Sequence, residues 1–204
     1  MSHTETKAYH HGNLRGALVE AGLEILELEG PSALSLRAVA RRAGVSHAAP
    51  AHHFATLGHL LAEMAAQGFT AFVSSLDAAA AQGKQDAVSR LKAMGRAYVM
   101  FAVGRPSLYA LMFRTNETIV WTDHLEQAAS AAWSQLAEAV APVLKRDAQD
   151  PLTRSGAVRV WSLVHGFASL SIDNRFPPNV RGEVNPDIME DAIATLPVLA
   201  KGVR

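Results

Sequence analysis

Residues 34–46 of the chain read LSLRAVARRAGVS, and this stretch decides the fold. Ser35 is a residue type that caps helix N-termini, so we expect a short helix to begin here. Gly44 supplies the left-handed backbone that commonly ends a helix. Ser46 is then placed to cap a second short helix, expected over His47–Phe54. Two short helices around a glycine-containing turn form a helix–turn–helix.

Helical periodicity continues on both sides of this stretch. Before it, apolar residues recur every three or four positions from Asn13 to a stop at Gly30 and Pro31. After it, Thr56 is placed to cap a long helix that ends at Gly83. Further helices are expected at residues 86–103, 106–113, 117–144, 150–172 and 186–199. The predicted fold class is all-α, with an N-terminal three-helix domain over residues 1–58 and a C-terminal helical domain over residues 59–204.

Composition excludes several classes of protein. Hydrophobic residues make up 49% of the chain, and cysteine is absent, so neither a disulfide framework nor a thiolate metal site can form. No apolar run approaches the roughly 18 residues of a membrane span. The N-terminus is polar and does not resemble a signal peptide. We therefore expect a soluble, cytoplasmic protein.

Charge is balanced overall but unevenly placed. The formal net charge is +0, yet Gly30–Ala62 contains no acidic residue. The same stretch carries arginines at 37, 41 and 42 and histidines at 47, 52, 53 and 59, whereas the helix before it carries glutamates at 20, 24, 27 and 29. A local basic face of this kind suits contact with phosphate groups.

Catalytic and metal-binding patterns are missing from the sequence. There is no nucleophile–base pairing, glycine-rich phosphate loop or paired-carboxylate motif. No two histidines are three or four positions apart, which is the spacing of zinc ligands on one helix face. We expect no enzyme activity, no metal site and no cofactor.

The second domain is rich in aromatic and apolar residues, interrupted by a few polar ones. Such a mixture is typical of an ordinary core, and it is also the lining of a ligand pocket between helices. The candidates for binding a small molecule are Arg96, Tyr98, Phe101, Tyr109, Met112, Phe113, Arg114, Asn116, Trp121, Trp133, Trp161 and His165.

Several of these stretches resemble one family. HHGNLR at residues 10–15, LSLRAVARRAGVS at 34–46 and HF at 53–54 closely resemble the DNA-binding domain of tetracycline-repressor (TetR) family regulators. PSLYALMF at 106–113 and WSLVHG at 161–166 resemble the regulatory domain of one TetR subtype. The resemblance implies a homodimer that binds a palindromic double-stranded DNA operator and is released by a small-molecule effector. It also places the dimer faces on the helices expected at residues 150–172 and 186–199.

The resemblance assigns DNA contacts to the helix–turn–helix. Helix N-termini bind phosphate, alanine methyl groups can pack on thymine methyl groups, and histidine can reach a base edge or a phosphate. The implied DNA-binding residues are Ser35, Arg37, Ser46, His47, Ala48, Ala49, Ala51, His52, His53 and Thr56.

Two positions depart from the family pattern. Ala51 stands where members generally carry a phosphate-binding tyrosine, and Leu57 stands where they carry a lysine. We therefore expect weaker DNA binding than in typical members. The alternative is a dimeric small-molecule-binding protein of the same fold whose specific DNA binding is weak or lost.

Overall fold

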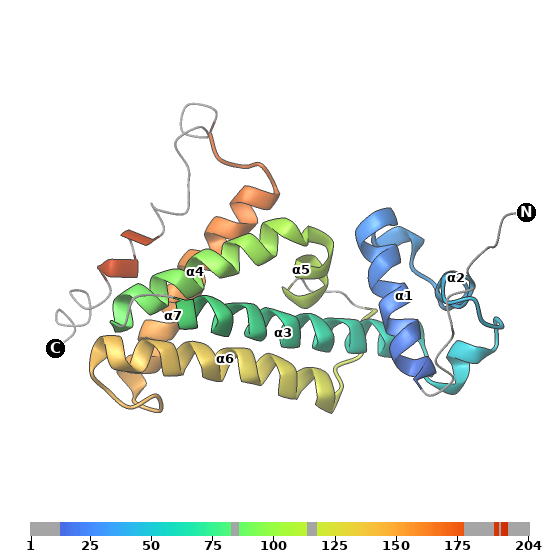
Figure 1. The fold of residues 1–204 in the computed structure, drawn as a ribbon, viewed down its shortest axis with the longest axis horizontal. Coiled ribbons are helices and arrows are strands. Elements are labelled where there is room, and N and C mark those ends of the chain that lie inside the picture. Colours follow the sequence, from blue (N-terminus) through green and yellow to red (C-terminus); the bar gives the residue numbers. More distant parts are fainter. Residues whose placement is uncertain (1–12, 83–85, 114–117, 178–189, 192, 196–204) are drawn as a thin grey trace, which may run out of the picture.

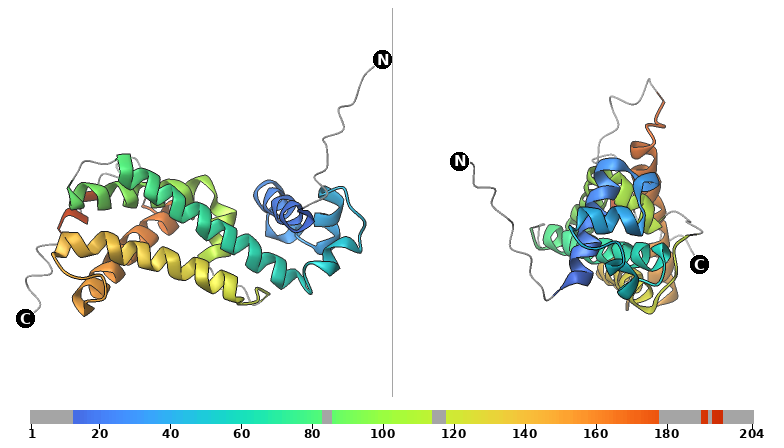
Figure 2. Two further views of the ribbon diagram at one scale, coloured as in Figure 1. Left: turned by 60° about the horizontal axis from the view of Figure 1, so that its bottom comes forward. Right: turned by 90° about the vertical axis from the view of Figure 1, so that its right-hand side faces the viewer.

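The chain is helical over most of its length, as the computed structural model shows for residues 13–82, 86–113, 118–177, 190–191 and 193–195. A small N-terminal unit lies at one end of an elongated molecule, and a larger helical bundle forms the rest (Figure 1, Figure 2). No strand occurs in these ranges, so the all-α prediction is confirmed. Within the same ranges, every helix is too short or too polar to cross a lipid bilayer.

The N-terminal unit begins with α1 (Leu14–Glu29), which the Asn13 side chain caps and Gly30 ends with a φ of +83°. After the short 3₁₀ helix η1 (Pro31–Ala33) comes α2 (Leu36–Arg42). The hydroxyl of Ser35 accepts a hydrogen bond from the amide of Ala38 at 3.1 Å, so the predicted cap is confirmed. Val39 and Ala40 are fully buried against the other helices.

The predicted second short helix was wrong in type and length. Residues 47–54 form a turn followed by the 3₁₀ helix η2 (Ala49–His52), and Ala48, not Ser46, stands at its start without a side-chain cap. Pro50 explains the difference, because proline has no amide to donate to the carbonyl of Ser46 four residues back. The amides of Ala49, Ala51 and His53 donate to the carbonyls of Ser46, Ala48 and Pro50, each with three-residue spacing, and the Phe54 amide donates to the same Pro50 carbonyl with four-residue spacing.

One long helix connects the two parts of the molecule. α3 (Leu57–Gln82) has 26 residues, starts shortly after η2 and continues deep into the bundle (Figure 1). It packs against α1 at its N-terminal end and against α4, α5 and α6 along its length. The predicted stop at Gly83 lies outside the described residues.

The bundle is completed by α4 (Ala87–Gly104), α5 (Pro106–Phe113), α6 (Asp123–Leu144) and α7 (Pro151–Ile172). The prediction for α6 was wrong at its start, because residues 118–122 are not helical and Thr122 caps the helix by accepting from the amide of Leu125 at 3.3 Å. The expected helix at residues 186–199 lies mostly outside the described residues. Of it, residues 190, 191, 193 and 194 are helical.

Candidate nucleic-acid interface and ligand cavity

The sequence-predicted DNA contacts lie on the surface of the N-terminal unit. Most of them are exposed: Ser35, Arg37, Ser46, His47, Ala48, Ala51, His52 and Thr56. Ala49 and His53 are half-buried. The buried members of the same segment are Pro50 and Phe54, which anchor it to the core. The segment 47–54 therefore exposes alanine and histidine side chains and buries Pro50 and Phe54 against the core.

The three arginines of this unit have different surroundings. Arg42 forms ion pairs with Glu24 and Glu29 of α1, so its charge is already partly neutralised. Arg37 and Arg41 are exposed and form no ion pair within the described residues. These two guanidinium groups are thus the cations of the face that are available to an anion such as a DNA phosphate.

The Thr56 side chain makes a specific contact at the start of α3. Its hydroxyl oxygen lies 2.8 Å from Nδ1 of His59, one turn into the helix. The backbone carbonyl of Thr56 accepts from the amides of His59 and Leu60. This contact fixes the His59 ring against the start of α3.

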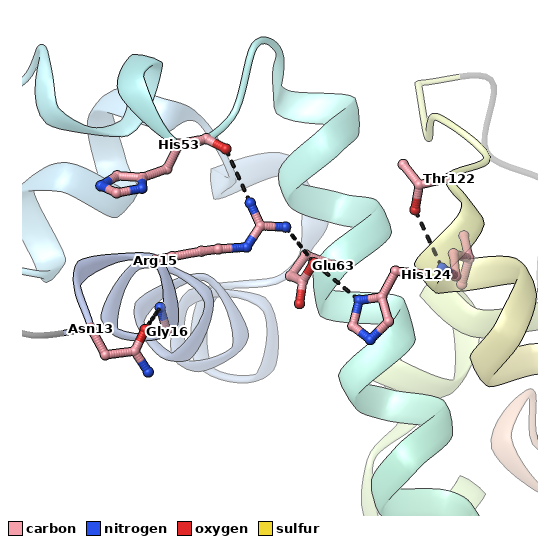
Figure 3. Close-up of polar contacts among 8 residues, drawn as sticks. Asn13, Arg15, Gly16, His53, Glu63, Thr122 and His124 are labelled. Atoms are coloured by element: carbon pink, nitrogen blue, oxygen red, sulfur yellow. Dashed lines mark hydrogen bonds and ion pairs between the residues drawn. The ribbon is translucent and has the colours of Figure 1, made fainter.

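A polar bridge links the N-terminal unit to the bundle (Figure 3). Arg15, in the first turn of α1, donates from Nη1 to the carbonyl of His53 at 3.2 Å and from Nη2 to Glu63 of α3 at 2.6 Å. The same Glu63 oxygen lies 3.2 Å from Nδ1 of His124 in the first turn of α6. The Arg15 guanidinium also stacks over the Phe54 ring, 4.8 Å from its centroid. Arg15 therefore ties the end of the segment 47–54 to α3, and through Glu63 to α6.

Glu63 titrates differently from a free carboxylate. Burial would raise its pKa, but hydrogen bonds and charge attraction from Arg15 and His124 outweigh burial and hold the pKa below its ordinary value. The side chain is 13% exposed, so the carboxylate is largely withdrawn from water. It therefore remains ionised and keeps the bridge intact at neutral pH.

A second contact joins the same regions through the backbone. The amide of Val120 donates to the carbonyl of Gly58 at 3.3 Å. A Cβ at Gly58 would lie 2.2 Å from the carbonyl oxygen of Thr118, so only glycine permits this approach. The segment 118–122 is thereby held against the first turn of α3.

An apolar cavity of about 470 Å³, partly open to solvent, lies among α3, α4, α5, α6 and α7. It is lined by Phe69, Phe72, Leu76, Leu91, Met94, Gly95, Tyr98, Leu111, Met112, Phe113, Ile119, Trp121, Leu125, Ala129, Ala132, Trp133, Leu136, Val160, Trp161 and Val164. Its volume falls in the range of pockets that enclose small organic molecules.

Some of the predicted effector residues line this cavity, and others do not. Tyr98, Met112, Phe113, Trp121, Trp133 and Trp161 belong to its lining. Tyr109 and His165 do not line it but bind the hydroxyl of Tyr98 from behind. Arg114 and Asn116 lie outside the described residues.

Two predicted residues point elsewhere, and the prediction that they face a ligand is not supported. Arg96 pairs with Glu190, with 2.7 Å between Nε and Oε1, because its long charged side chain reaches the surface. Phe101 packs edge-to-face on Phe72 at 5.3 Å and beneath the Arg105 guanidinium, so it supports the cavity from outside.

A hydrogen-bonded triad closes one side of the cavity. Nδ1 of His165 lies 2.8 Å from the hydroxyl oxygens of both Tyr98 and Tyr109, and these two oxygens are 3.3 Å apart. Burial raises the pKa of Tyr98 well above its usual value, and the neighbouring Tyr109 raises it further. Tyr98 is therefore a neutral hydroxyl at any physiological pH.

Sequence reasoning missed the aliphatic half of the lining and the polar bridge. Residues such as Leu76, Leu91 and Val160 repeat with helical periodicity, and that periodicity is the same for a filled core and for a cavity lining. Arg15 and Glu63 are 48 positions apart, so no local pattern joins them. The available signal for the bridge was that Glu63 is the first acidic residue after the acid-free stretch Gly30–Ala62.

A helix–turn–helix unit joined by one helix to a bundle with an internal cavity is the arrangement of a one-component transcriptional regulator. Residues 18–72 match the bacterial regulatory proteins of the tetR family, and residues 91–196 match the tetracyclin repressor-like C-terminal domain. The chain belongs to the TetR family of transcriptional regulators, which are DNA-binding proteins and not enzymes.

Solved structures share this fold. A protein of unknown function from Rhodococcus sp. RHA1 is 28% identical, with a TM-score of 0.75 over 97% of this chain and 98% of that chain. A protein described as a tetR family transcription regulator from Shewanella sp. PV-4 is 17% identical, with a TM-score of 0.63, and the match covers 89% of this chain and 94% of that chain. FadR from Bacillus subtilis, solved in complex with stearoyl-CoA, is 11% identical, with a TM-score of 0.64 over 93% of this chain and 100% of that chain. No curated protein matches the sequence significantly.

Proposed function

We propose that the chain is a ligand-responsive repressor that binds a palindromic operator as a homodimer and leaves it when a small molecule occupies the cavity. Residues 1–58 form the DNA-binding domain, and residues 59–204 form the effector-binding and dimerisation domain. One observation carries the proposal: α3 starts beside the DNA-facing segment and supplies Phe69, Phe72 and Leu76 to the cavity. A regulator of chromosomal genes works in the cytoplasm.

Dimerisation is supported by apolar side chains on the surface of the bundle. On α7, Val158 and Leu170 are 48% and 43% exposed. Apolar side chains of this size gain free energy when another surface buries them. A second copy of the chain would cover them and would set the distance between the two DNA-facing segments. Operator half-sites one helical turn apart, about 34 Å, require such a fixed distance.

The effector acts by preferring a subunit arrangement that does not fit the operator. The coupling is reciprocal, so operator DNA weakens effector binding by the same factor. The solved complex of FadR with stearoyl-CoA is an instance of a protein with this fold that holds a ligand.

Gel mobility shift with DNA from around the chain's own gene tests the proposal. We expect Arg37→Ala to weaken binding about tenfold or more, because each dimer loses two phosphate contacts, and to flatten the salt dependence. Arg90→Ala is the matched control, since it removes an exposed arginine at the start of α4. Equal affinity of the Arg37→Ala and Arg90→Ala variants would contradict the proposed DNA face.

One observation favours the second candidate, a small-molecule-binding dimer with weak or lost specific DNA binding. The DNA-facing segment is a single 3₁₀ helix with Ala51 exposed at a position where the family carries a larger, phosphate-binding side chain. A dimer that binds ligand but shifts none of the fragments from around its gene would establish this candidate.

A further inference from the structure

We propose that the cavity selects an uncharged, mainly apolar molecule with an aromatic ring system that presents a hydrogen-bond acceptor to the Tyr98 hydroxyl. This inference rests on the proposed function, in which the cavity is the effector site, and it adds the chemical class of the effector.

The described part of the lining disfavours a charged ligand. Every described residue that lines the cavity is aromatic, aliphatic, methionine or glycine, and none carries a charge. Transfer of an ion from water into such surroundings is strongly unfavourable unless an opposite charge meets it. Of the two arginines that the sequence offered for this purpose, Arg96 is already paired with Glu190, and Arg114 lies outside the described residues.

The shape and surface of the lining favour flat rings. Three phenylalanines, one tyrosine and three tryptophans surround the space. Trp133 and Trp161 meet edge-to-face with their ring centres 6.2 Å apart, and Phe69 and Phe113 do so at 5.2 Å. Aromatic guests gain from stacked and edge-to-face contacts with such rings beyond simple burial.

The Tyr98 hydroxyl provides the directional contact. The single Nδ1 of His165 has either one lone pair or one hydrogen, so it cannot serve the hydroxyls of Tyr98 and Tyr109 in the same role at once. When Tyr109 donates to Nδ1 of His165, the hydrogen of the Tyr98 hydroxyl has to be directed to another acceptor. A carbonyl or ether oxygen of a ligand in the cavity would be such an acceptor. Of the two tyrosines, only Tyr98 lines the cavity, so its hydroxyl is the one that can donate to the ligand.

Four probes on one scaffold separate these requirements. 2-Acetonaphthone is neutral with an acceptor, 2-ethylnaphthalene is neutral without one, 2-naphthoate is an anion, and 2-naphthylmethylammonium is a cation. All three tryptophans of the chain line the cavity, so we expect its occupancy to quench intrinsic fluorescence. Titration of the full-length protein without DNA keeps this test separate from operator release.

We expect both neutral probes to bind and the anion and the cation to bind at least about tenfold more weakly than the ketone. Tyr98→Phe should weaken the ketone about fivefold and leave the hydrocarbon unchanged, because only the ketone loses a hydrogen bond. Tyr109→Phe removes the other hydroxyl of the triad and should preserve ketone binding. Ala132→Trp, which fills the cavity from α6, should abolish binding of both neutral probes.

Charged probes that bind as tightly as the ketone, or a ketone affinity that Tyr98→Phe does not change, would overturn the inference, as would failure of all four probes to bind. Thermal unfolding of each variant shows that the fold is retained. If the ketone binds as expected but the protein shifts no DNA, the chemical class stands and the repressor proposal fails.

Discussion

Arg15 and Glu63 form an ion pair of 2.6 Å between α1 and α3, although 48 residues separate them in the sequence. Arg15 is 49% exposed and Glu63 only 13%, so the carboxylate depends on the arginine more than the reverse. The pair is the centre of the bridge in Figure 3, with His124 on one side and the His53 carbonyl on the other.

We predict that Arg15→Ala lowers the free energy of unfolding by about 1–2 kcal/mol, because it leaves a largely buried carboxylate with His124 as its one remaining partner in the bridge. Urea denaturation measures the effect. Arg146→Ala is the control, since its partner Asp150 is a surface i,i+4 contact worth no more than about 0.5 kcal/mol. Equal losses in the two variants would show that the bridge adds nothing.

Acid should weaken the same bridge. The folded-state pKa of Glu63 lies below its ordinary value of 4.5, so its stabilisation is present above that value and is lost as pH falls through the folded pKa. The stability difference between wild type and Glu63→Gln should shrink as the pH is lowered from about 6 to about 3. A Glu63→Gln difference that stays constant with pH would contradict the assignment.

Gly58→Ala should be strongly destabilising, by about 2 kcal/mol or more, because its Cβ would collide with the Thr118 carbonyl at 2.2 Å. Gly104→Ala places the same methyl group where no atom lies within 4 Å. That control should be neutral or stabilising by up to about 1 kcal/mol. Thermal melts of both variants distinguish local crowding from a general effect of alanine.

The same substitution should have opposite effects at two threonines. Thr153 is fully buried, and its hydroxyl has no hydrogen-bond partner within the described residues. Thr153→Val should stabilise the protein by about 1 kcal/mol, because it removes an unsatisfied polar group at constant shape. Thr122→Val should destabilise it by about 1 kcal/mol, because it removes the cap of α6. Calorimetric melting temperatures that move in the same direction would contradict this account.

Local rules predicted the helix ends that depend on local chemistry. Ser35, Asn13 and Gly30 act within one turn of their own positions, and all three function as their residue types suggest. Pro50 shows the limit of such rules. A proline near a helix start is usually tolerated, but here its missing amide leaves a 3₁₀ helix in place of an α-helix.

The ligand cavity was predictable in kind but not in its membership. Tyr98, Trp133 and Trp161 were nominated as aromatic residues among polar ones, and they line the space. Whether a side chain meets a neighbour or a void depends on how five helices pack, and this packing is set by contacts distant in sequence. Phe101 and Arg96 were expected to face the ligand because each is one turn or less from a cavity residue, but both side chains face away from the cavity.

The length of α3 means that a small tilt of this helix moves its end a long way. A helix of 26 residues is about 39 Å long at 1.5 Å per residue. If it stays straight and pivots near its C-terminal end, a tilt of about 5° displaces the opposite end by about 3 Å. Two such rods in a symmetric pair would change their separation by up to twice that amount, so small angular adjustments deep in the bundle become ångström-scale changes at the distant tips.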